Sequence, residues 1–333
     1  MQALVTGATG LIGSRLCRHL VENGWQIRAL VLPGENTDHL PKDGVEFWTG
    51  DVTDPDTLTG IAEDADVVFH LAARVLDYGS RKQFYDTIYK GTRHMLAACA
   101  DTAGRFVYAS SVAALGFGRH LKGLNESARC KKSGIPYNDA KTDAEDLVRA
   151  YQDRFENGCT IFRPTNVVGP RSAWVDEVGR QFVKAYLPLI DGGRHSAALI
   201  HVDNLVDGVI RAGTVPEASG ETYHFRDDWA VTWKQYLTDL GAMLGKKPVG
   251  SVPFPAAWTL GKVSETLMTP IGLRPPVTRL AAGVMGRNND VDNSKAKREL
   301  GWQTRVSYAE AMAEIRDHVG KTLKPSVTSG NPH

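Results

Sequence analysis

Short apolar runs alternate with segments of helical periodicity through the first half of the chain. The apolar runs are predicted to be buried strands, and the periodic segments between them are predicted to be helices. The predicted strands cover residues 3–7, 26–32, 45–51, 66–73, 105–111 and 159–169. The predicted helices cover 11–23, a segment from Pro55, 81–103 and 137–157. This alternation is typical of βαβ units, so we expect an α/β fold with a parallel sheet covered on both faces.

The rhythm changes after Gly169. One more strand and helix are predicted within "GRHSAALIHVDNLVDGVIRAG", and further helices are expected at 232–244, 294–302 and 307–319 around a Pro-rich stretch at 248–276. We therefore predict a nucleotide-binding domain formed by 1–169 with 200–226. A smaller, mostly helical C-terminal substrate domain is predicted for 170–199 with 227–325, followed by a flexible tail at 326–333.

Composition and charge narrow the classes of function. The net charge of +1 over 333 residues leaves no basic footprint, so a nucleic-acid partner is not expected. The N-terminus has no basic region before its apolar run, and the stretch 252–273 carries charges and prolines, so neither a signal peptide nor a spanning segment is predicted. The four scattered cysteines suit a reducing cytoplasm. His195 and His201 lack an H-E-x-x-H context, so no metal is predicted.

A glycine-rich loop follows the first predicted strand. "TGATGLIG" places Gly7, Gly10 and Gly13 between that strand and the start of a helix. Glycines let the backbone approach a pyrophosphate, and a helix N-terminus offers free N–H groups and a positive dipole end. The spacing is G-x-x-G-x-x-G, and the loop predicts a dinucleotide cofactor.

The form of that cofactor stays open. A carboxylate at the end of the second strand selects NAD, whereas an arginine there accommodates the extra phosphate of NADP. The strand ends Ala29 to Leu32 and offers neither, and Glu35 lies beyond Pro33-Gly34 and is expected to be too far away. Asp51, after the third strand, either binds the adenine amino group or caps the turn in "GDVTDPD", and both roles remain open.

Two tyrosine–lysine pairs share the spacing Y-x-x-x-K. One is Tyr137 with Lys141 in "SGIPYNDAKT", and the other is Tyr78 with Lys82 in "YGSRK". The first pair begins a predicted helix downstream of a serine-bearing strand that ends near Ser111. An i,i+4 pair on a helix lies on one face, so both side chains of this pair can point at one bound group. The second pair sits in a loop that enters a long helix, so we expect the first to be the functional one.

These motifs together resemble the extended short-chain dehydrogenase/reductase family. The resemblance covers nearly the whole chain. It rests on "TGATGLIG", "GDVTD", "HLAA" (70–73), "YASSVAALG" (108–116), "YNDAK", "RPTNVVGP" (163–170), "IHVDNLVDG" (200–208) and "SKAKRELGW". The apolar segment 258–286 is most similar to the 3β-hydroxysteroid dehydrogenase and dihydroflavonol reductase-like branch. The resemblance implies a Rossmann-type doubly wound parallel sheet and NAD or NADP as cofactor.

The resemblance also implies the site residues. Tyr137 is expected to be the general acid/base, Lys141 to lower its pKa, and Ser111 to hydrogen-bond the substrate oxygen. The expected cofactor-binding residues are Gly7, Thr9, Gly10, Leu11, Ile12, Gly13, Leu32, Asp51, Val52, Leu71, Ala72, Ala73, Tyr137, Lys141, Pro164, Thr165 and Val167. Two positions depart from the family pattern: Ile88 replaces an asparagine associated with a proton path, and Leu32 replaces an arginine found in relatives with a "VRPG"-like turn.

The favoured function is an NAD(P)-dependent oxidoreductase that interconverts a secondary alcohol and a ketone on an apolar, steroid-, flavonol- or alkyl-ketone-like substrate. The alternative is a nucleotide-sugar epimerase or dehydratase that retains NAD, and a third possibility is a cofactor-binding sensor without turnover. The resemblance also implies a homodimer, through a four-helix bundle made by the helices at 81–103 and 137–157.

Overall fold

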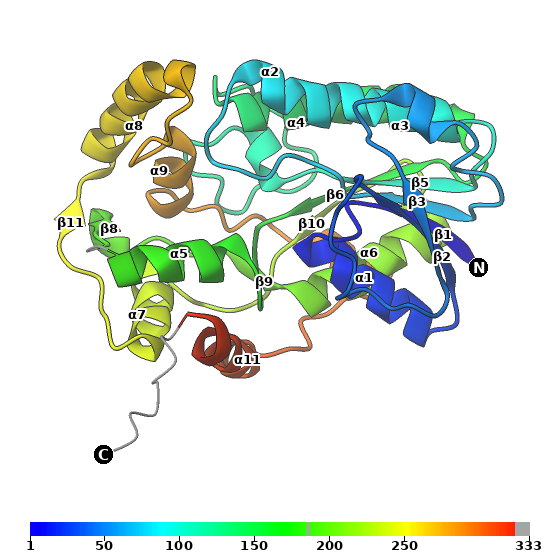
Figure 1. The fold of residues 1–333 in the computed structure, drawn as a ribbon. Helices are drawn as coiled ribbons and strands as arrows, with labels where there is room; N and C mark the ends of the chain where they lie inside the picture. The colour runs from blue at the N-terminus through cyan, green and yellow to red at the C-terminus, as the bar shows by residue number, and fades with distance from the viewer. Residues whose placement is uncertain (185–186, 324–333) are drawn as a thin grey trace, which may run out of the picture.

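The computed structural model describes residues 1–184 and 187–323, and its centre is a seven-stranded parallel sheet (Figure 1). The strands run in the order β10-β6-β5-β4-β1-β2-β3. Their bounds are β1 Gln2–Thr6, β2 Gln26–Val31, β3 Val45–Thr49, β4 Val67–His70, β5 Arg105–Ala109, β6 Cys159–Pro164 and β10 Thr222–Phe225. The order reverses between β1 and β4, which is the switch point where ligands bind in doubly wound sheets. The predicted α/β fold of the Rossmann type is confirmed.

Helices cover both faces of this sheet. α1 (Leu11–Glu22) and α6 (Val202–Thr214) pack together on one face, while α3 (Gly91–Cys99) and α4 (Pro136–Ala150) cover the other (Figure 1). The predicted long helix at 81–103 is present as α2 (Arg81–Phe84), a π-helical segment at Tyr85–Lys90, and α3. Ile88 lies in the π-helical segment and is fully buried under the sheet.

Two predicted elements differ from the structure. The helix expected from Pro55 is only a 3₁₀ turn at Pro55–Leu58, because Asp54 caps it and Gly60 follows with a positive φ. The strand expected at 159–169 ends at Pro164. The chain then leaves the large sheet, and β7 (Asn166–Val168) pairs with β9 (Leu199–His201) in a separate two-stranded sheet.

Most of the remaining helices pack around a second apolar core that surrounds Trp233. They are α5 (Ala173–Lys184), α7 (Trp233–Met243), α8 (Phe254–Met268), α9 (Arg279–Met285) and α11 (Tyr308–Thr322), whereas α10 (Ser294–Leu300) lies outside this core. β8 (Leu189–Ile190) and β11 (Ser251–Val252) form a short parallel pair beside them. α10 joins the first core instead, through Leu300 and the following Trp302.

The division into 1–169 with 200–226 and 170–199 with 227–325 stays a prediction, and the predicted tail at 326–333 lies outside the described residues. No helix of the described ranges has the length and apolar character needed to cross a membrane.

Candidate active site

Ser111 stands at the carboxyl end of β5, near the switch point of the sheet. It caps the 3₁₀ turn Val112–Leu115, and its hydroxyl oxygen accepts the backbone N–H of Ala113 at 3.1 Å. This contact fixes the side chain on the edge where ligands bind, because the turn that it caps is itself buried.

Tyr137 is the second residue of α4, which begins at Pro136. Its ring packs edge-on against Phe84 with centroids 6.2 Å apart. Burial raises the pKa of the Tyr137 phenol, and a hydrogen bond with Ser111 acts in the opposite direction. Tyr137 and Ser111 are therefore brought together, as the sequence predicted, and a cation beside them would favour the phenolate further.

Lys141 lies one helical turn after Tyr137 and is buried. Its Nζ donates a hydrogen bond to the carbonyl oxygen of Ala109 at the end of β5 and lies 4.9 Å from the centre of the Tyr108 ring. Burial lowers the pKa of Lys141 to about 7, and the charge of Glu145 opposes part of that shift. An ammonium with this pKa gains or loses its proton near neutral pH, as an acid/base site requires.

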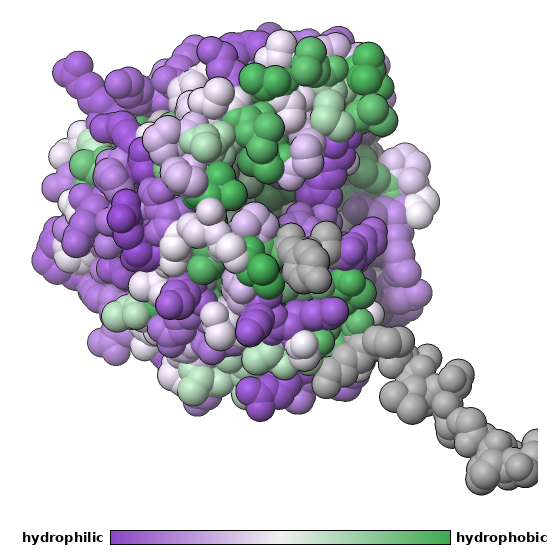
Figure 2. Space-filling view, turned by 90° about the vertical axis from the view of Figure 1, so that its left-hand side faces the viewer, coloured by the Kyte–Doolittle hydropathy of each residue, from purple (hydrophilic) through white to green (hydrophobic). Residues whose placement is uncertain are grey.

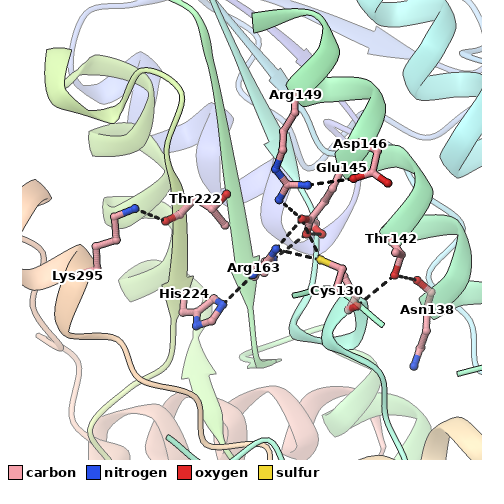
Figure 3. A network of polar contacts seen from close by, with 12 residues as sticks. Cys130, Asn138, Thr142, Glu145, Asp146, Arg149, Arg163, Thr222, His224 and Lys295 are labelled. Atoms are coloured by element: carbon pink, nitrogen blue, oxygen red, sulfur yellow. Dashed lines mark hydrogen bonds and ion pairs between the residues drawn. The ribbon is translucent and has the colours of Figure 1, made fainter. Parts of the chain in front are cut away.

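A buried polar network lies behind Lys141 on the same helix (Figure 3). Glu145 accepts hydrogen bonds from Arg163 at 2.8 and 2.7 Å, from Ser110 at 2.5 Å and from Arg149 at 2.6 Å. Burial alone would raise the pKa of Glu145, but the hydrogen bonds and charge of Arg163 lower it to about 2. The network ties α4 to the ends of β5 and β6, so the helix that bears Tyr137 and Lys141 is fixed against both strands.

The glycine-rich loop has the shape that a pyrophosphate requires. A Cβ on Gly7 would lie 2.9 Å from the backbone nitrogen of Ala72, and one on Gly13 would lie 2.1 Å from the Gly7 carbonyl oxygen. α1 begins after Gly10, and no side chain caps its N-terminus. Its first turn also contains no acidic residue, so no negative charge of this turn competes with a bound phosphate. The residues present fit a dinucleotide, and when bound such a cofactor supplies or accepts a hydride.

The segment after β4 forms the other side of this loop. Leu71, Ala72 and Ala73 follow the buried His70, and the N–H of Ala72 donates to Thr6 Oγ1 at 3.1 Å. His70 bridges Thr6 Oγ1 at 2.8 Å and Thr92 Oγ1 at 3.1 Å. Burial, together with the charge of Lys141, lowers the pKa of His70 to about 3. His70 is therefore neutral, and its ring connects Thr6 and Thr92 by hydrogen bonds.

Asp51 performs the local role that the sequence suggested. Its Oδ1 accepts the N–H of Thr53 at 2.8 Å, which forms a tight turn after β3. A contact with adenine stays a prediction. Val52 is buried beneath α3, where a Cβ on Gly91 would come within 2.8 Å of it, so its side chain packs into the core.

The residues after β6 were predicted to flank the nicotinamide, and that role stays a prediction. Pro164 ends the strand, and both the N–H and the hydroxyl of Thr165 donate to the Phe225 carbonyl oxygen, at 3.0 and 3.2 Å. Val167 follows in β7 and is partly buried. Thr165 therefore marks the point where the chain turns out of the large sheet.

Three charged side chains make contacts that the sequence interpretation did not predict. Glu35 was expected to be too far along the chain to serve as the ribose carboxylate, and in the structure it lies at the end of β2, where its carboxylate accepts the N–H of Leu32 at 3.0 Å. Arg171 donates to the Thr9 carbonyl oxygen at 3.2 Å. Arg274 forms ion pairs with both Glu177 and Asp77, which lie far apart in the sequence. Arg171 and Arg274 lie far in sequence from their partners, so spacing gave no signal for their contacts, whereas Glu35 follows Leu32 by only three residues.

One group within the described ranges has the composition of a metal site. Ligand atoms of His201, Asp203 and Glu314 lie within 4.8 Å of one another. Arg15 already contacts Glu314, and its Nε lies 3.7 Å from Asp203, so a guanidinium supplies the positive charge at this group.

Comparison with known proteins agrees with this geometry. Residues 3–225 match the sequence model of the NAD-dependent epimerase/dehydratase family, across the glycine-rich loop, the Tyr137–Lys141 pair and the last strand of the large sheet. The chain belongs to that family. The predicted membership of the extended short-chain dehydrogenase/reductases is confirmed, and the chain is an NAD(P)-dependent oxidoreductase.

Several family members are similar to this chain over almost their whole length. One is the 4-hydroxy-2-methyl-3-oxo-4-farnesyl-3,4-dihydroquinoline-1-oxide ketoreductase of Stigmatella aurantiaca, which is 31% identical with 95% of this chain and 96% of the relative covered. Another is the 2-alkyl-3-oxoalkanoate reductase of Stenotrophomonas maltophilia, which is 28% identical over 95% and 98%. The solved UDP-glucose 4-epimerase of Thermotoga maritima is 21% identical with a TM-score of 0.78 over 97% and 100%, which shows the shared fold.

Proposed function

We propose that this family member interconverts a secondary alcohol and a ketone on an apolar substrate, with Ser111, Tyr137 and Lys141 as its catalytic residues. The observation that carries the proposal is the buried Lys141 one turn after Tyr137, with Tyr137 hydrogen-bonded to Ser111. The names of similar proteins agree with the reaction class, since they include ketoreductases and a 3β-hydroxysteroid dehydrogenase/isomerase of Mycobacterium tuberculosis, 26% identical over 94% of this chain and 89% of that protein.

Each side chain has a defined task in this proposal. In the direction of reduction, Ser111 donates a hydrogen bond to the carbonyl oxygen of the substrate and holds it beside Tyr137. Tyr137 gives its phenolic proton to that oxygen as the carbonyl carbon receives the hydride. The Lys141 ammonium stabilises the phenolate that is left.

The surroundings of Tyr137 favour an apolar substrate. Tyr137 packs against the core that contains Phe117 and Leu121, and Trp258 of α8 reaches the same core. Gly118 is needed there because a Cβ on it would lie 2.6 Å from the Trp258 ring. The part of a substrate that extends from Tyr137 toward this core would contact apolar side chains rather than charged ones.

The arginines of the substrate side argue against a nucleotide diphosphate. Arg274 is paired with Glu177 and Asp77, Arg279 with Glu265 at 2.7 Å, and Arg287 lies 3.7 Å from Asp191. Binding a diphosphate with these guanidinium groups would leave carboxylates without their partners.

The outer surface of α8 continues the apolar character. Leu260, Val263 and Leu267 are exposed along one stripe of the helix, and Ile271 follows in the next turn. α8 lies at the top of the face seen in Figure 2, where hydrophobic residues gather. An exposed apolar patch of this kind is typical of a surface that meets an apolar ligand or partner.

The test is a panel of substrates with both cofactors. Purified protein with NADH or NADPH is expected to reduce members of a panel of steroid ketones, flavonols and alkyl ketones, and to leave UDP-glucose unchanged. Conversion of UDP-glucose without turnover of any panel ketone would contradict the proposal and support the nucleotide-sugar alternative. Tight retention of NAD through purification would point the same way.

The remaining predictions concern the oligomeric state, the cellular location and the domain boundaries. The helical segments at 81–99 and α4 pack together in one chain, so a second copy is proposed to complete a four-helix bundle. Light scattering during size-exclusion chromatography measures this: a mass twice 36.3 kDa supports the dimer, and a mass equal to it contradicts the dimer. The cytoplasmic location and the interleaved domain boundaries also stay proposals.

A further inference from the structure

The turn after β2 brings Glu35 back to the end of the strand that it follows. The N–H of Glu35 donates to the Leu32 carbonyl oxygen at 3.1 Å, and Gly34 has a φ of +75°. Proline followed by a glycine of positive φ is the signature of a type II β-turn, which reverses the chain within four residues. Glu35, three positions along the sequence, therefore lies beside Leu32 in space.

The carboxylate of Glu35 bridges two parts of the cofactor loop. One oxygen accepts the N–H of Leu32 at 3.0 Å, and the other accepts the hydroxyl of Thr9 at 2.5 Å. Leu32 follows β2, and Thr9 belongs to the glycine-rich loop. In a Rossmann-type site the ribose of adenosine lies between these two segments, and a carboxylate there accepts a hydrogen bond from its 2′-hydroxyl.

The charges nearby favour the same interpretation. Within the described ranges Glu35 forms no ion pair, and Leu32 is uncharged. Lys42 in the same loop is 3.7 Å from Asp38, so it is already paired. A 2′-phosphate between Thr9 and Leu32 would face an uncompensated carboxylate, whereas a hydroxyl would find an acceptor with unused lone pairs.

Two further side chains contact the other side of Thr9. Arg171 and His39 lie 3.2 and 3.0 Å from the Thr9 carbonyl oxygen and 3.3 Å from each other. Arg171 contacts the loop from the segment after β7. It is placed to act on the diphosphate, which NAD and NADP share.

We infer that Glu35 makes this chain select NAD(H) over NADP(H). This inference requires that the protein binds a nicotinamide cofactor, as the proposed function does, but it does not depend on which substrate is reduced. It also accounts for the absence of a carboxylate within β2 itself, because the turn supplies one from three positions further on.

The experiment is a calorimetric titration of the protein, freed of bound cofactor, with NADH and with NADPH. The wild-type protein is expected to bind NADH at least tenfold more tightly. Glu35→Gln keeps the size of the side chain and removes its charge, so the ratio of the two dissociation constants is expected to fall toward one. Asp38→Asn in the same loop is the matched control and is expected to leave the ratio unchanged. Unfolding temperatures of all variants establish that each is folded.

Arg171→Gln tests whether Arg171, rather than Glu35, distinguishes the two cofactors. It is expected to weaken NADH and NADPH binding by the same factor, because the diphosphate is common to both. Tighter binding of NADPH by the wild type, or an unchanged ratio in Glu35→Gln, would overturn the inference, as would a selective loss of NADPH binding in Arg171→Gln. The measurement needs no substrate, so a failed substrate panel and a failed cofactor preference give separate results.

Discussion

The two tyrosine–lysine pairs of this chain match at a third position as well. Glu145 follows Lys141 by four residues, and Asp86 follows Lys82 by four. Asp86 pairs directly with Lys82, and the Lys82 side chain is 82% exposed. Glu145 is instead bound by Arg163 and Ser110, and Lys141 is 3% exposed. The same spacing gives a solvated ion pair on one helix and a buried, unpaired ammonium on the other.

The difference arises from where each tyrosine meets its helix. Tyr137 lies inside α4, so four residues bring Lys141 to the same face. Tyr78 precedes Ser80, which caps α2 in a capping box with Gln83, so Tyr78 is outside the helix. Its ring packs under Arg274 at 5.3 Å. The tyrosine–lysine spacing thus places two groups at one site only when one helix contains both residues. The lysine stays free of an ion pair only when the acid four residues later is bound by another residue, as Glu145 is by Arg163 of β6.

Of the substitutions that test the difference between the two pairs, Tyr137→Phe is expected to have the largest effect. Removing the hydroxyl removes the proposed general acid, so kcat/KM for ketone reduction is expected to fall by about 10²–10⁴-fold. Steady-state kinetics with the best panel substrate measure it. Tyr78→Phe removes the hydroxyl of the other pair, and an equal loss there would contradict the assignment.

Glu145→Gln tests the network that keeps Lys141 free. The variant leaves Arg163 buried without its carboxylate, so the free energy of unfolding at pH 7 is expected to fall by about 3–5 kcal/mol. Urea denaturation measures it. Because the pKa of Glu145 is lowered from 4.5 to about 2, its contribution is present above pH 4.5 and is lost as pH falls toward 2. The difference between the wild type and the variant should shrink over that range, and a constant difference would argue against the ion pair. Asp86→Asn, four residues after Lys82, should change stability little.

Lys141→Met is expected to have a smaller effect on catalysis than Tyr137→Phe. It removes the cation that favours the phenolate, which costs roughly tenfold in rate for each unit by which the Tyr137 pKa rises. Lys141 loses its proton as pH rises through about 7, so kcat/KM for reduction should decline above that pH in the wild type. A pH–rate profile of Lys141→Met that keeps the same decline would show that another group titrates.

The smallest expected effect is that of Lys82→Met. An exposed pair contributes little, so kcat/KM and the unfolding midpoint should both stay close to those of the wild type. A loss of more than about fivefold in kcat/KM, well beyond ordinary error, would mean that α2 takes part in the site.

The sequence was sufficient for the layers of the fold and for the position of the Tyr137–Lys141 pair. Buried strands and amphipathic helices alternate with clear periods, and Pro136 marks the start of α4. Contacts made by chain reversal were out of reach. Glu35 returns to Leu32 through a Pro-Gly turn whose geometry the sequence interpretation did not use. Arg171 contacts Thr9 across a long separation in sequence, and the chain changes sheets at Thr165, because in these two cases tertiary pairing outweighs local pattern. The π-helical segment around Ile88 gave no sequence signal either.

The place of β10 has a consequence for how the chain is made. This strand completes the large sheet beside β6, and its Phe225 packs on Trp302 with ring centroids 5.3 Å apart. A nascent chain emerging from the ribosome therefore holds an unfinished sheet edge through synthesis of the first two thirds of its length. The large sheet reaches its final packing only after residue 302 has been released into solution, so the folding of the N-terminal part depends on a residue from the C-terminal part of the chain.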